Sequence, residues 1–335
     1  MGTEYFYQER NTPAVIIIRI KPYYPILQKI IIICGPTGVG KTGFAIELAR
    51  QLGGQIVGAD SMQIYRHMDI GTAKPTAVER AAVTHHMVDI VDPDQHFDAA
   101  AFGTLAHQVV QSLIQHNIVP LVVGGTGLYI KALLYGLFKG RPVGKKVRRQ
   151  LQQQIEKEGP AALHARLARH DPQTAERLHP NDTYRIIRAL EVLLQTGVPI
   201  SRHHHAHGFY KPRYQALKIG LNLPREQLYA RIDARVEQML AAGLEKEARW
   251  LLQKGYGPDL KAMQSLGYRH MIDYLQGRLS QDEAVRTLKR DHRRYAKRQL
   301  TWFRADDSVQ WLLPNQLPMA MQLAEAFLSD PPAEP

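Results

Sequence analysis

A glycine-rich segment near the start of the chain has the residue types and spacing of a phosphate-binding loop. It follows the apolar run Ile30–Cys34 and consists of Gly35, Pro36, Thr37, Gly38, Val39, Gly40, Lys41 and Thr42. Glycines between a strand and a helix let backbone N–H groups surround phosphate oxygens, and the helix N-terminus adds partial positive charge. Lys41 supplies a full positive charge, and the Thr42 hydroxyl can bind Mg²⁺. The segment therefore predicts a site for a phosphate or a diphosphate, without specifying a nucleotide.

Two charged residues farther along the chain each allow two interpretations. Asp60 follows the predicted strand over residues 55–59, where its carboxylate acts either as a general base or as a cap of the following turn. Arg235 falls at the edge of the apolar stripe of the predicted helix Arg225–Ala241. Because an unpaired buried charge is costly, Arg235 requires an anionic partner. That partner is either a nearby carboxylate or a bound phosphate group.

The histidines in the run His203–His207 have the residue type of metal ligands, but no carboxylate or cysteine is spaced with them as metal sites require. We expect a basic loop there. The one cysteine, Cys34, excludes an internal disulfide and a multi-cysteine zinc site. Its place in a predicted strand indicates that it is buried and inert.

Length and composition are those of an ordinary globular protein. The chain has 335 residues, enough for one large domain with an insertion or for two domains. Hydrophobic residues make up 44% and charged residues 22% of it, which excludes a disordered or fibrous protein. No apolar run approaches the roughly 20 residues of a membrane span, and residues 1–28 lack the layout of a signal peptide. We therefore expect a cytoplasmic protein with an N-terminal extension over residues 1–28.

The formal net charge is +12, and the distribution of the charges is more informative than their sum. Asp and Glu are absent from two long stretches, Ala99–Ile155 and Val192–Arg225. A third stretch, Arg286–Arg304, carries many Lys and Arg residues against a single acid, Asp291. Solvated helices usually mix the two signs. Three one-signed stretches therefore favour a nucleic-acid surface over a basic face that is merely solvated.

Strands and helices alternate through the first part of the chain. Apolar runs predict strands over residues 30–34, 55–59, 118–123 and 217–221, and helices over residues 42–51 and 99–115. This order predicts an α/β fold with a phosphate loop and a parallel sheet covered by helices, in which ligands bind beyond the carboxyl ends of the strands. The strand ends at Gly35–Thr42, Asp60–Gln63 and Gly124–Thr126 should therefore face one crevice.

The rest of the chain is predominantly helical in pattern. Helices are predicted over residues 225–241, 244–253, 263–276 and 280–304. Residues 141–208 are rich in Gln and Arg, which together with their periodicity predicts a helical insertion. We thus divide the chain into an extension (1–28), a core with C-terminal helices (29–140 and 209–315), the insertion (141–208), and a C-terminal helix and tail (316–335).

Several longer motifs make the chain resemble the tRNA dimethylallyltransferase family, in its bacterial form. The motifs occur in that family's order over most of the chain and are Gly35–Thr42, Asp60–Arg66, Asp69–Pro75, His86–Ile90, Val123–Tyr129, Arg185–Glu191 and Arg294–Phe303. The phosphate loop alone occurs in many NTPases. Asp60 together with Asp69–Pro75 is specific to the family.

The resemblance implies a reaction and a set of roles. The reaction is the transfer of a dimethylallyl group from dimethylallyl diphosphate to N6 of the adenine just 3′ of a tRNA anticodon, with Mg²⁺ as cofactor. The loop, with Thr37 and Lys41, would hold the donor diphosphate together with Arg235, and Asp60 would be the general base. The implied contacts with the anticodon stem-loop are Asp60, Ser61, Met62, Gln63, Thr126, Arg148, Tyr184, Arg185, Ile186, Ile187, Arg188, Gln264, Ser265, Leu266, Gly267, Tyr268 and Arg269. We expect a monomer that is not bound to a membrane.

The chain departs from the family pattern at some points. Position 184 is Tyr where many relatives carry Gln, so stacking on a base would replace an amide contact there. The family does not explain residues 1–28, and the Cys/His zinc module of some eukaryotic relatives is absent.

Two other functions would use some of the same residues. A nucleotide-dependent kinase or other NTPase needs an acidic Mg²⁺ ligand at a strand end, and only Asp60 fits, although its flanking Ser-Met-Gln belongs to the transferase pattern. A non-catalytic RNA-binding protein would not need Lys41, Thr42 and Asp60, all of which are present.

Overall fold

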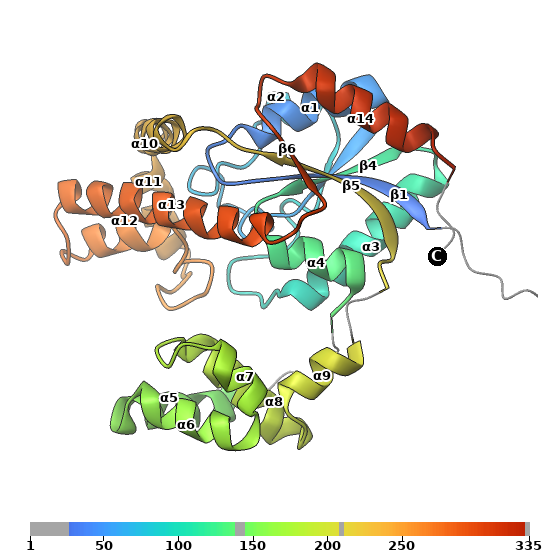
Figure 1. Cartoon of the computed structure of the whole chain (residues 1–335). Helices are drawn as coiled ribbons and strands as arrows, with labels where there is room; N and C mark the ends of the chain where they lie inside the picture. The colour runs from blue at the N-terminus through green and yellow to red at the C-terminus, as the bar shows by residue number, and fades with distance from the viewer. Residues whose placement is uncertain (1–26, 138–144, 208–210, 332–335) are drawn as a thin grey trace, which may run out of the picture.

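The computed structural model of the chain describes residues 27–137, 145–207 and 211–331, and these form a sheet covered by helices with a separate helical part below it (Figure 1). The strands are β1 (Gln28–Cys34), β2 (Gly54–Gly58), β3 (His85–His86), β4 (Val119–Gly124), β5 (Tyr214–Leu221) and β6 (Val309–Leu312). They make one 6-stranded sheet in the order β3-β2-β4-β1-β5-β6, and every neighbouring pair is parallel. The predicted parallel α/β fold is confirmed.

Strand β1 is buried on both faces, which explains its unbroken isoleucine run. Ile30 and Ile32 pack into one apolar core, and Ile31 and Ile33 pack into the other. The helices α3 (Ala99–Gln115) and α4 (Gly127–Tyr135) cover the first face, and α1 (Lys41–Leu52) and α14 (Leu317–Ser329) cover the second (Figure 1). Cys34 ends the strand and is buried, as expected, and burial raises the pKa of its thiol to about 12.

Four C-terminal helices stand beside the sheet, at the side where the phosphate loop leaves β1 (Figure 1). They are α10 (Arg225–Ala241), α11 (Leu244–Gln253), α12 (Tyr268–Leu275) and α13 (Gln281–Arg304), and the short α2 (Ala77–Ala82) precedes β3. Helix α12 begins at Tyr268, so the predicted start at Met263 was wrong. Gly267 directly before it has a φ of 92°, a backbone conformation that interrupts helices.

The insertion is a bundle of helices with a small core of its own. It comprises α5 (Lys145–Glu158), α6 (Pro160–His170), α7 (Pro172–Arg177), α8 (Thr183–Thr196) and α9 (Ile200–His207), and it packs around Leu163, Leu167, Ile186 and Leu190. The basic loop expected over His203–His207 was wrong, because that run lies in α9. Buried Asp171 accepts a hydrogen bond of 3.1 Å from the Ser201 backbone N–H and so holds the first turn of α9.

Some predicted features fall outside the described residues. These are the extension up to residue 26 and the end of the tail from residue 332, together with Lys139 and Arg141 of one acid-free stretch. Within the three described ranges, no helix has the length and apolarity needed to cross a membrane.

Candidate active site

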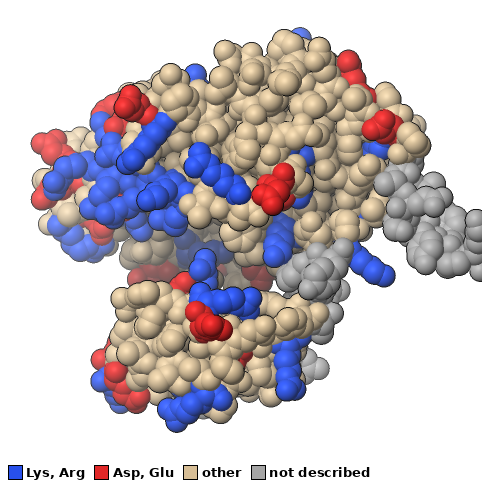
Figure 2. All heavy atoms as spheres, viewed as in Figure 1, with Lys and Arg blue, Asp and Glu red and all other residues tan. Residues whose placement is uncertain are grey.

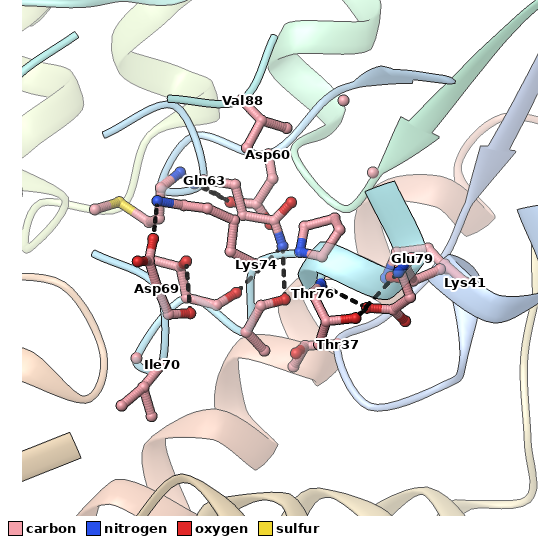
Figure 3. Close-up of a pocket in the computed structure, with 18 of the residues that line it drawn as sticks. Thr37, Lys41, Asp60, Gln63, Asp69, Ile70, Lys74, Thr76, Glu79 and Val88 are labelled. Atoms are coloured by element: carbon pink, nitrogen blue, oxygen red, sulfur yellow. Dashed lines mark hydrogen bonds and ion pairs between the residues drawn. The ribbon is translucent and has the colours of Figure 1, made fainter. Parts of the chain in front are cut away.

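The carboxyl ends of three neighbouring strands meet, as the sequence predicted. The registers pair Cys34 with Gly124 and Gly58 with Val123, so β1, β2 and β4 end at one level. The Thr126 N–H donates to the Ala59 carbonyl at 3.2 Å and ties the last two ends together. Beyond them lies a cavity of about 1160 Å³, lined by residues of the loop, of Asp60–Gln63 and of the C-terminal helices. Figure 3 shows Thr37 and Lys41 at one end of this cavity and Asp69 and Ile70 at the other.

The phosphate loop has the shape that only glycine permits. Gly35 has a φ of 137°, and a Cβ there would lie 2.4 Å from the Leu221 carbonyl oxygen. Gly38 has a φ of 80°, and its Cβ would lie 2.8 Å from Ile232 Cγ1. The loop therefore lies in close contact with β5 and α10, which leaves no room for a side chain at Gly35 or Gly38.

Lys41 folds over the loop that precedes it. Its Nζ donates to the Gly35 and Pro36 carbonyls at 3.0 and 2.8 Å. Burial, and secondarily the nearby Arg235, lower the pKa of Lys41 to about 8, while Asp60 acts in the opposite direction. The ammonium group is thus a half-buried cation that forms no ion pair with a carboxylate of the described residues.

Because Lys41 has a pKa near 8, we expect kcat/KM for an anionic substrate at this loop to fall as pH rises through about 8. Below that pH the lysine is protonated and attracts the anion; above it, kcat/KM should drop by about tenfold per pH unit. Rate measurements at limiting substrate from pH 6 to 10 test this. Lys41→Arg keeps its charge over the whole range. A wild-type profile that stays flat up to pH 10 would show that Lys41 charge does not drive binding.

Arg235 is the second cation at the loop, and the structure decides between its two possible partners. Its Nη1 lies 3.4 Å from Thr37 Oγ1. Among the described residues, no carboxylate forms an ion pair with it, and its buried Nε has no hydrogen-bond partner. Burial lowers the pKa of Arg235, and Asp60 acts in the opposite direction. The salt-bridge interpretation therefore fails, and a bound anion is the partner that fits.

Asp60 caps the following turn and also lines the cavity, the position that a general base would need. Its Oδ1 accepts hydrogen bonds from the backbone N–H groups of Met62 and Gln63 at 2.8 and 3.3 Å, which caps the turn. Within the described ranges, Oδ2 accepts no hydrogen bond, and Asp60 lines the cavity. One oxygen thus fixes the carboxylate, and the other is available to accept a proton from a ligand.

Polar side chains hold the turns around Asp60. The Ser61 N–H donates to Thr126 Oγ1 at 3.1 Å. Gln63 Nε2 donates to the carbonyls of Thr72 and Ala73 at 3.2 and 3.1 Å, and so joins the Asp60 turn to the following loop. Of these predicted tRNA contacts, Asp60, Met62 and Gln63 line the cavity, whereas Ser61 and Thr126 hold the turn behind it.

Buried Gln299 on α13 is a functional residue to which sequence reasoning gave no role of its own. Its Oε1 accepts from the Thr37 N–H at 2.8 Å, and its Nε2 donates to the Gly125 carbonyl at 2.9 Å. It thus bridges the phosphate loop and the end of β4. A signal was available, since Gln299 falls on the buried stripe of its helix with Leu288, Ala296 and Phe303. A polar residue on such a stripe needs partners within the protein.

Lys74 was also missed as an individual residue. Its side chain is only 1% exposed, and its Nζ contacts Asp69 Oδ1 at 2.5 Å, Asp89 Oδ1 at 2.6 Å and the Tyr65 carbonyl at 2.8 Å. Arg80 binds the second oxygen of Asp89 at 2.7 Å. This ion cluster ties the loop of residues 69–74 to Tyr65 and Asp89, and Figure 3 shows Lys74 beside Asp69.

The predicted contacts at 264–269 are divided between the cavity and the protein interior. Ser265 and Leu266 line the cavity. Tyr268 is fully buried, and Arg269 contacts Asp291 at 2.5 Å on α13. The segment thus supplies part of the cavity wall and also anchors it.

The predicted contacts in the insertion lie apart from the cavity. Tyr184 is 68% exposed, and the Arg148 guanidinium lies over its ring at 5.3 Å. Arg148 and Arg188 also face the buried Glu191 at 3.5 and 3.6 Å. Ile186 and Ile187 are buried in the core of the insertion, which leaves Tyr184, Arg185 and Arg188 as the exposed side chains of this run.

A basic surface accompanies the cavity. Figure 2 shows Lys and Arg side chains gathered where Figure 1 draws α13. The exposed cations of that helix are Arg286, Arg290, Arg294, Lys297, Arg298 and Arg304. Such a surface favours a polyanion that reaches the cavity from this side.

Comparison with known proteins identifies relatives over most of the chain. The sequence profile described as "IPP transferase" matches residues 63–306. The tRNA dimethylallyltransferase of Desulfosudis oleivorans is 54% identical over 288 residues, which are 86% of this chain and 92% of that protein. The tRNA dimethylallyltransferase 1 of Pelobacter propionicus is 52% identical over 288 residues, 86% of this chain and 93% of that one.

Solved structures agree with the sequence comparison. The tRNA isopentenylpyrophosphate transferase of Bacillus halodurans superposes with a TM-score of 0.67 at 40% identity, covering 90% of this chain and 97% of that one. A eukaryotic dimethylallyltransferase described as acting on tRNA superposes with a TM-score of 0.77 at 27% identity, covering 92% of this chain and 81% of that one.

Proposed function

The chain belongs to the IPP transferase family, and from this premise we propose that it transfers the dimethylallyl group of dimethylallyl diphosphate to a tRNA adenine. The enzyme class follows from the relatives, which are named tRNA dimethylallyltransferases. The acceptor atom in our proposal is N6 of the adenine just 3′ of the anticodon. The residue roles below are our inference from the site.

The observation that carries the proposal is the pair of half-buried cations at the phosphate loop. Lys41 and Arg235 face the loop without an ion-pair partner in the described residues, and Asp60 lies nearby with one free oxygen. A diphosphate leaving group gains negative charge as its bond to carbon breaks. Fixed cations and loop N–H groups would stabilise that charge at the place where it develops.

The transfer step needs one base and one leaving group. The lone pair of the adenine amine attacks the allylic carbon, and the electron pair of the C–O bond leaves with the diphosphate. The amine proton passes to Asp60 Oδ2, while Oδ1 stays bound to the turn. An exocyclic amine is a weak nucleophile, so removal of its proton as the N–C bond forms assists the reaction.

Mg²⁺ fits the donor side of this site. The Thr42 hydroxyl lines the cavity at the start of α1 and has no hydrogen-bond partner among the described residues. Mg²⁺ prefers oxygen ligands and commonly combines one or two protein oxygens with substrate phosphates. Thr42 would therefore hold the ion together with the diphosphate. When bound, Mg²⁺ would neutralise part of the leaving-group charge.

The RNA side of the proposal rests on the basic surface and the exposed insertion residues. An adenine inside a stacked loop must leave its stack to reach a buried cavity, as in other base-modifying enzymes. The cations of α13 would bind phosphates beside the cavity, and Tyr184 with Arg148 would offer a stacking surface. A cytoplasmic location and a monomeric state remain predictions.

One incubation tests the proposed function. The protein is mixed with Mg²⁺, dimethylallyl diphosphate and an unmodified tRNA transcript, and the digested nucleosides are separated by mass. We expect N6-dimethylallyladenosine, and none from a control transcript in which guanine replaces the adenine 3′ of the anticodon. Prenylation of both transcripts would reject the assigned acceptor, and prenylation of neither would reject the function.

A further inference from the structure

The cavity wall opposite the phosphate loop is held by a single carboxylate from α11. Glu247 accepts hydrogen bonds from three successive backbone N–H groups, those of Asp69, Ile70 and Gly71, at distances of 2.9 to 3.1 Å. It also accepts from the Tyr268 hydroxyl at 2.5 Å. Charge-assisted hydrogen bonds of this kind are stronger than neutral ones. Four donors on two segments therefore converge on one side chain.

The two segments that Glu247 joins both form the cavity wall. Ile70 and Gly71 line the cavity from one segment, and Ser265 and Leu266 line it from the other. The segments belong to different parts of the chain: residues 69–71 lie outside the helices and strands, and Tyr268 is the first residue of α12.

The contact between the segments is close and specific. A Cβ at Gly71 would lie 2.5 Å from the Tyr268 ring, and a Cβ at Gly267 would lie 3.7 Å from Gly71 Cα. Burial, and secondarily Glu247, raise the pKa of Tyr268 well above its usual value, so the hydroxyl stays a donor. The arrangement thus depends on a glycine, a buried tyrosine and a charged acceptor.

The wall is also connected to the Asp60 turn. Gln63 donates to the Thr72 and Ala73 carbonyls, directly after the three N–H groups that bind Glu247. A shift of residues 69–71 would therefore change the position of Gln63. None of these contacts involves Lys41 or Arg235. Figure 3 shows Thr37 and Lys41 away from Asp69 and Ile70, and Arg235 contacts Thr37.

We propose that Glu247 is a positioning residue for the RNA substrate, because it joins residues 69–71 to Tyr268 and so shapes the acceptor wall without touching the donor site. The inference rests on the proposed function for its kinetic consequence. Its structural part, protection of three backbone N–H groups by Glu247, can be measured independently of catalysis.

Glu247→Gln is the variant that tests the proposal. It keeps the length of the side chain, but its N–H₂ group cannot accept from a backbone N–H or from Tyr268, so at least one hydrogen bond is lost. We expect kcat/KM for tRNA to fall by about tenfold, and KM for dimethylallyl diphosphate to change by less than about twofold. Tyr268→Phe removes one of the four donors. It should lower kcat/KM for tRNA by a smaller factor and likewise leave KM for dimethylallyl diphosphate nearly unchanged.

Glu245→Gln is the matched control. Glu245 is on the same helix, and it pairs with Arg249 at 2.6 Å on the surface instead of entering the wall. This variant should keep wild-type kinetics for both substrates. Amide hydrogen exchange should accelerate at residues 69–71 in Glu247→Gln and stay unchanged in Glu245→Gln.

The possible failures are distinguishable. Unchanged amide exchange at residues 69–71 in Glu247→Gln would show that Glu247 does not hold this segment. Faster exchange with an unchanged kcat/KM for tRNA would overturn the positioning role. So would an equal fall of kcat/KM for tRNA and for dimethylallyl diphosphate in both Glu247→Gln and Tyr268→Phe. Absence of prenylated adenosine with the wild-type protein would instead reject the proposed function, while the exchange result still tests whether Glu247 holds this segment.

Discussion

Asp60→Ala should lower kcat by about 10²–10⁴-fold, the range for a lost general base. The affinity for tRNA should fall much less, because the basic surface of α13 and the insertion do not depend on this carboxylate. Single-turnover rates with saturating tRNA and donor, together with a filter-binding Kd for tRNA, measure the two effects separately.

Asp60→Asn distinguishes the role of Asp60 as a general base from its role as a cap of the turn. The asparagine oxygen can still accept from the Met62 and Gln63 N–H groups, so the turn should persist, but an amide does not take up a proton at neutral pH. We therefore expect a rate loss as large as that of Asp60→Ala. Near-wild-type turnover in Asp60→Asn would show that Asp60 acts only as a structural cap.

Arg235→Ala should lower kcat/KM for dimethylallyl diphosphate by about 10²-fold or more, comparable to the loss of one preorganised donor to a developing anion. The guanidinium is half-buried beside Thr37 and has no carboxylate partner in the described residues, so the substitution leaves no orphaned acid behind. The tRNA Kd should stay within about threefold of wild type, because a phosphate contact made at the donor loop is absent from tRNA binding.

The control for this variant lies on the same helix. Arg225 is exposed at the start of α10, where its guanidinium stacks over the Tyr229 ring at 5.1 Å. Arg225→Ala should leave the donor kinetics unchanged. Two results would contradict the expectation for Arg235→Ala: an equal weakening of the binding of dimethylallyl diphosphate and of tRNA, or melting at a much lower temperature than Arg225→Ala. Either result would show that Arg235 supports the fold and does not bind the diphosphate specifically.

The sheet and the diphosphate-binding end of the cavity could be predicted because short stretches of sequence specify them. Ile30–Cys34 is a short apolar run, and the glycines that follow it fix a turn before a helix. The edge position of Arg235 on its helix already required an anionic partner. The choice between a carboxylate and a phosphate needed coordinates, because only they show that no carboxylate of the described residues forms an ion pair with Arg235.

The acceptor wall could not be predicted because its contacts are long-range. Glu247 binds residues that lie 176 to 178 positions earlier, and Gln299 binds Thr37 across 262 positions. The His203–His207 run was expected to be a basic loop because it lacks the residues of a metal site, yet it is helical, and Asp171 stabilises the start of that helix from another part of the insertion. Tertiary contacts of this kind override local preference.

In the proposed reaction the loop of residues 35–42 holds a leaving diphosphate and not a nucleotide that is hydrolysed. The most direct measurement counts diphosphate released and N6-dimethylallyladenosine formed in one reaction with unmodified tRNA, Mg²⁺, dimethylallyl diphosphate and ATP. We predict equal amounts of the two products, no release without tRNA, and no loss of ATP. Hydrolysis of ATP without prenylated adenosine would contradict the claim and assign the loop to an NTPase.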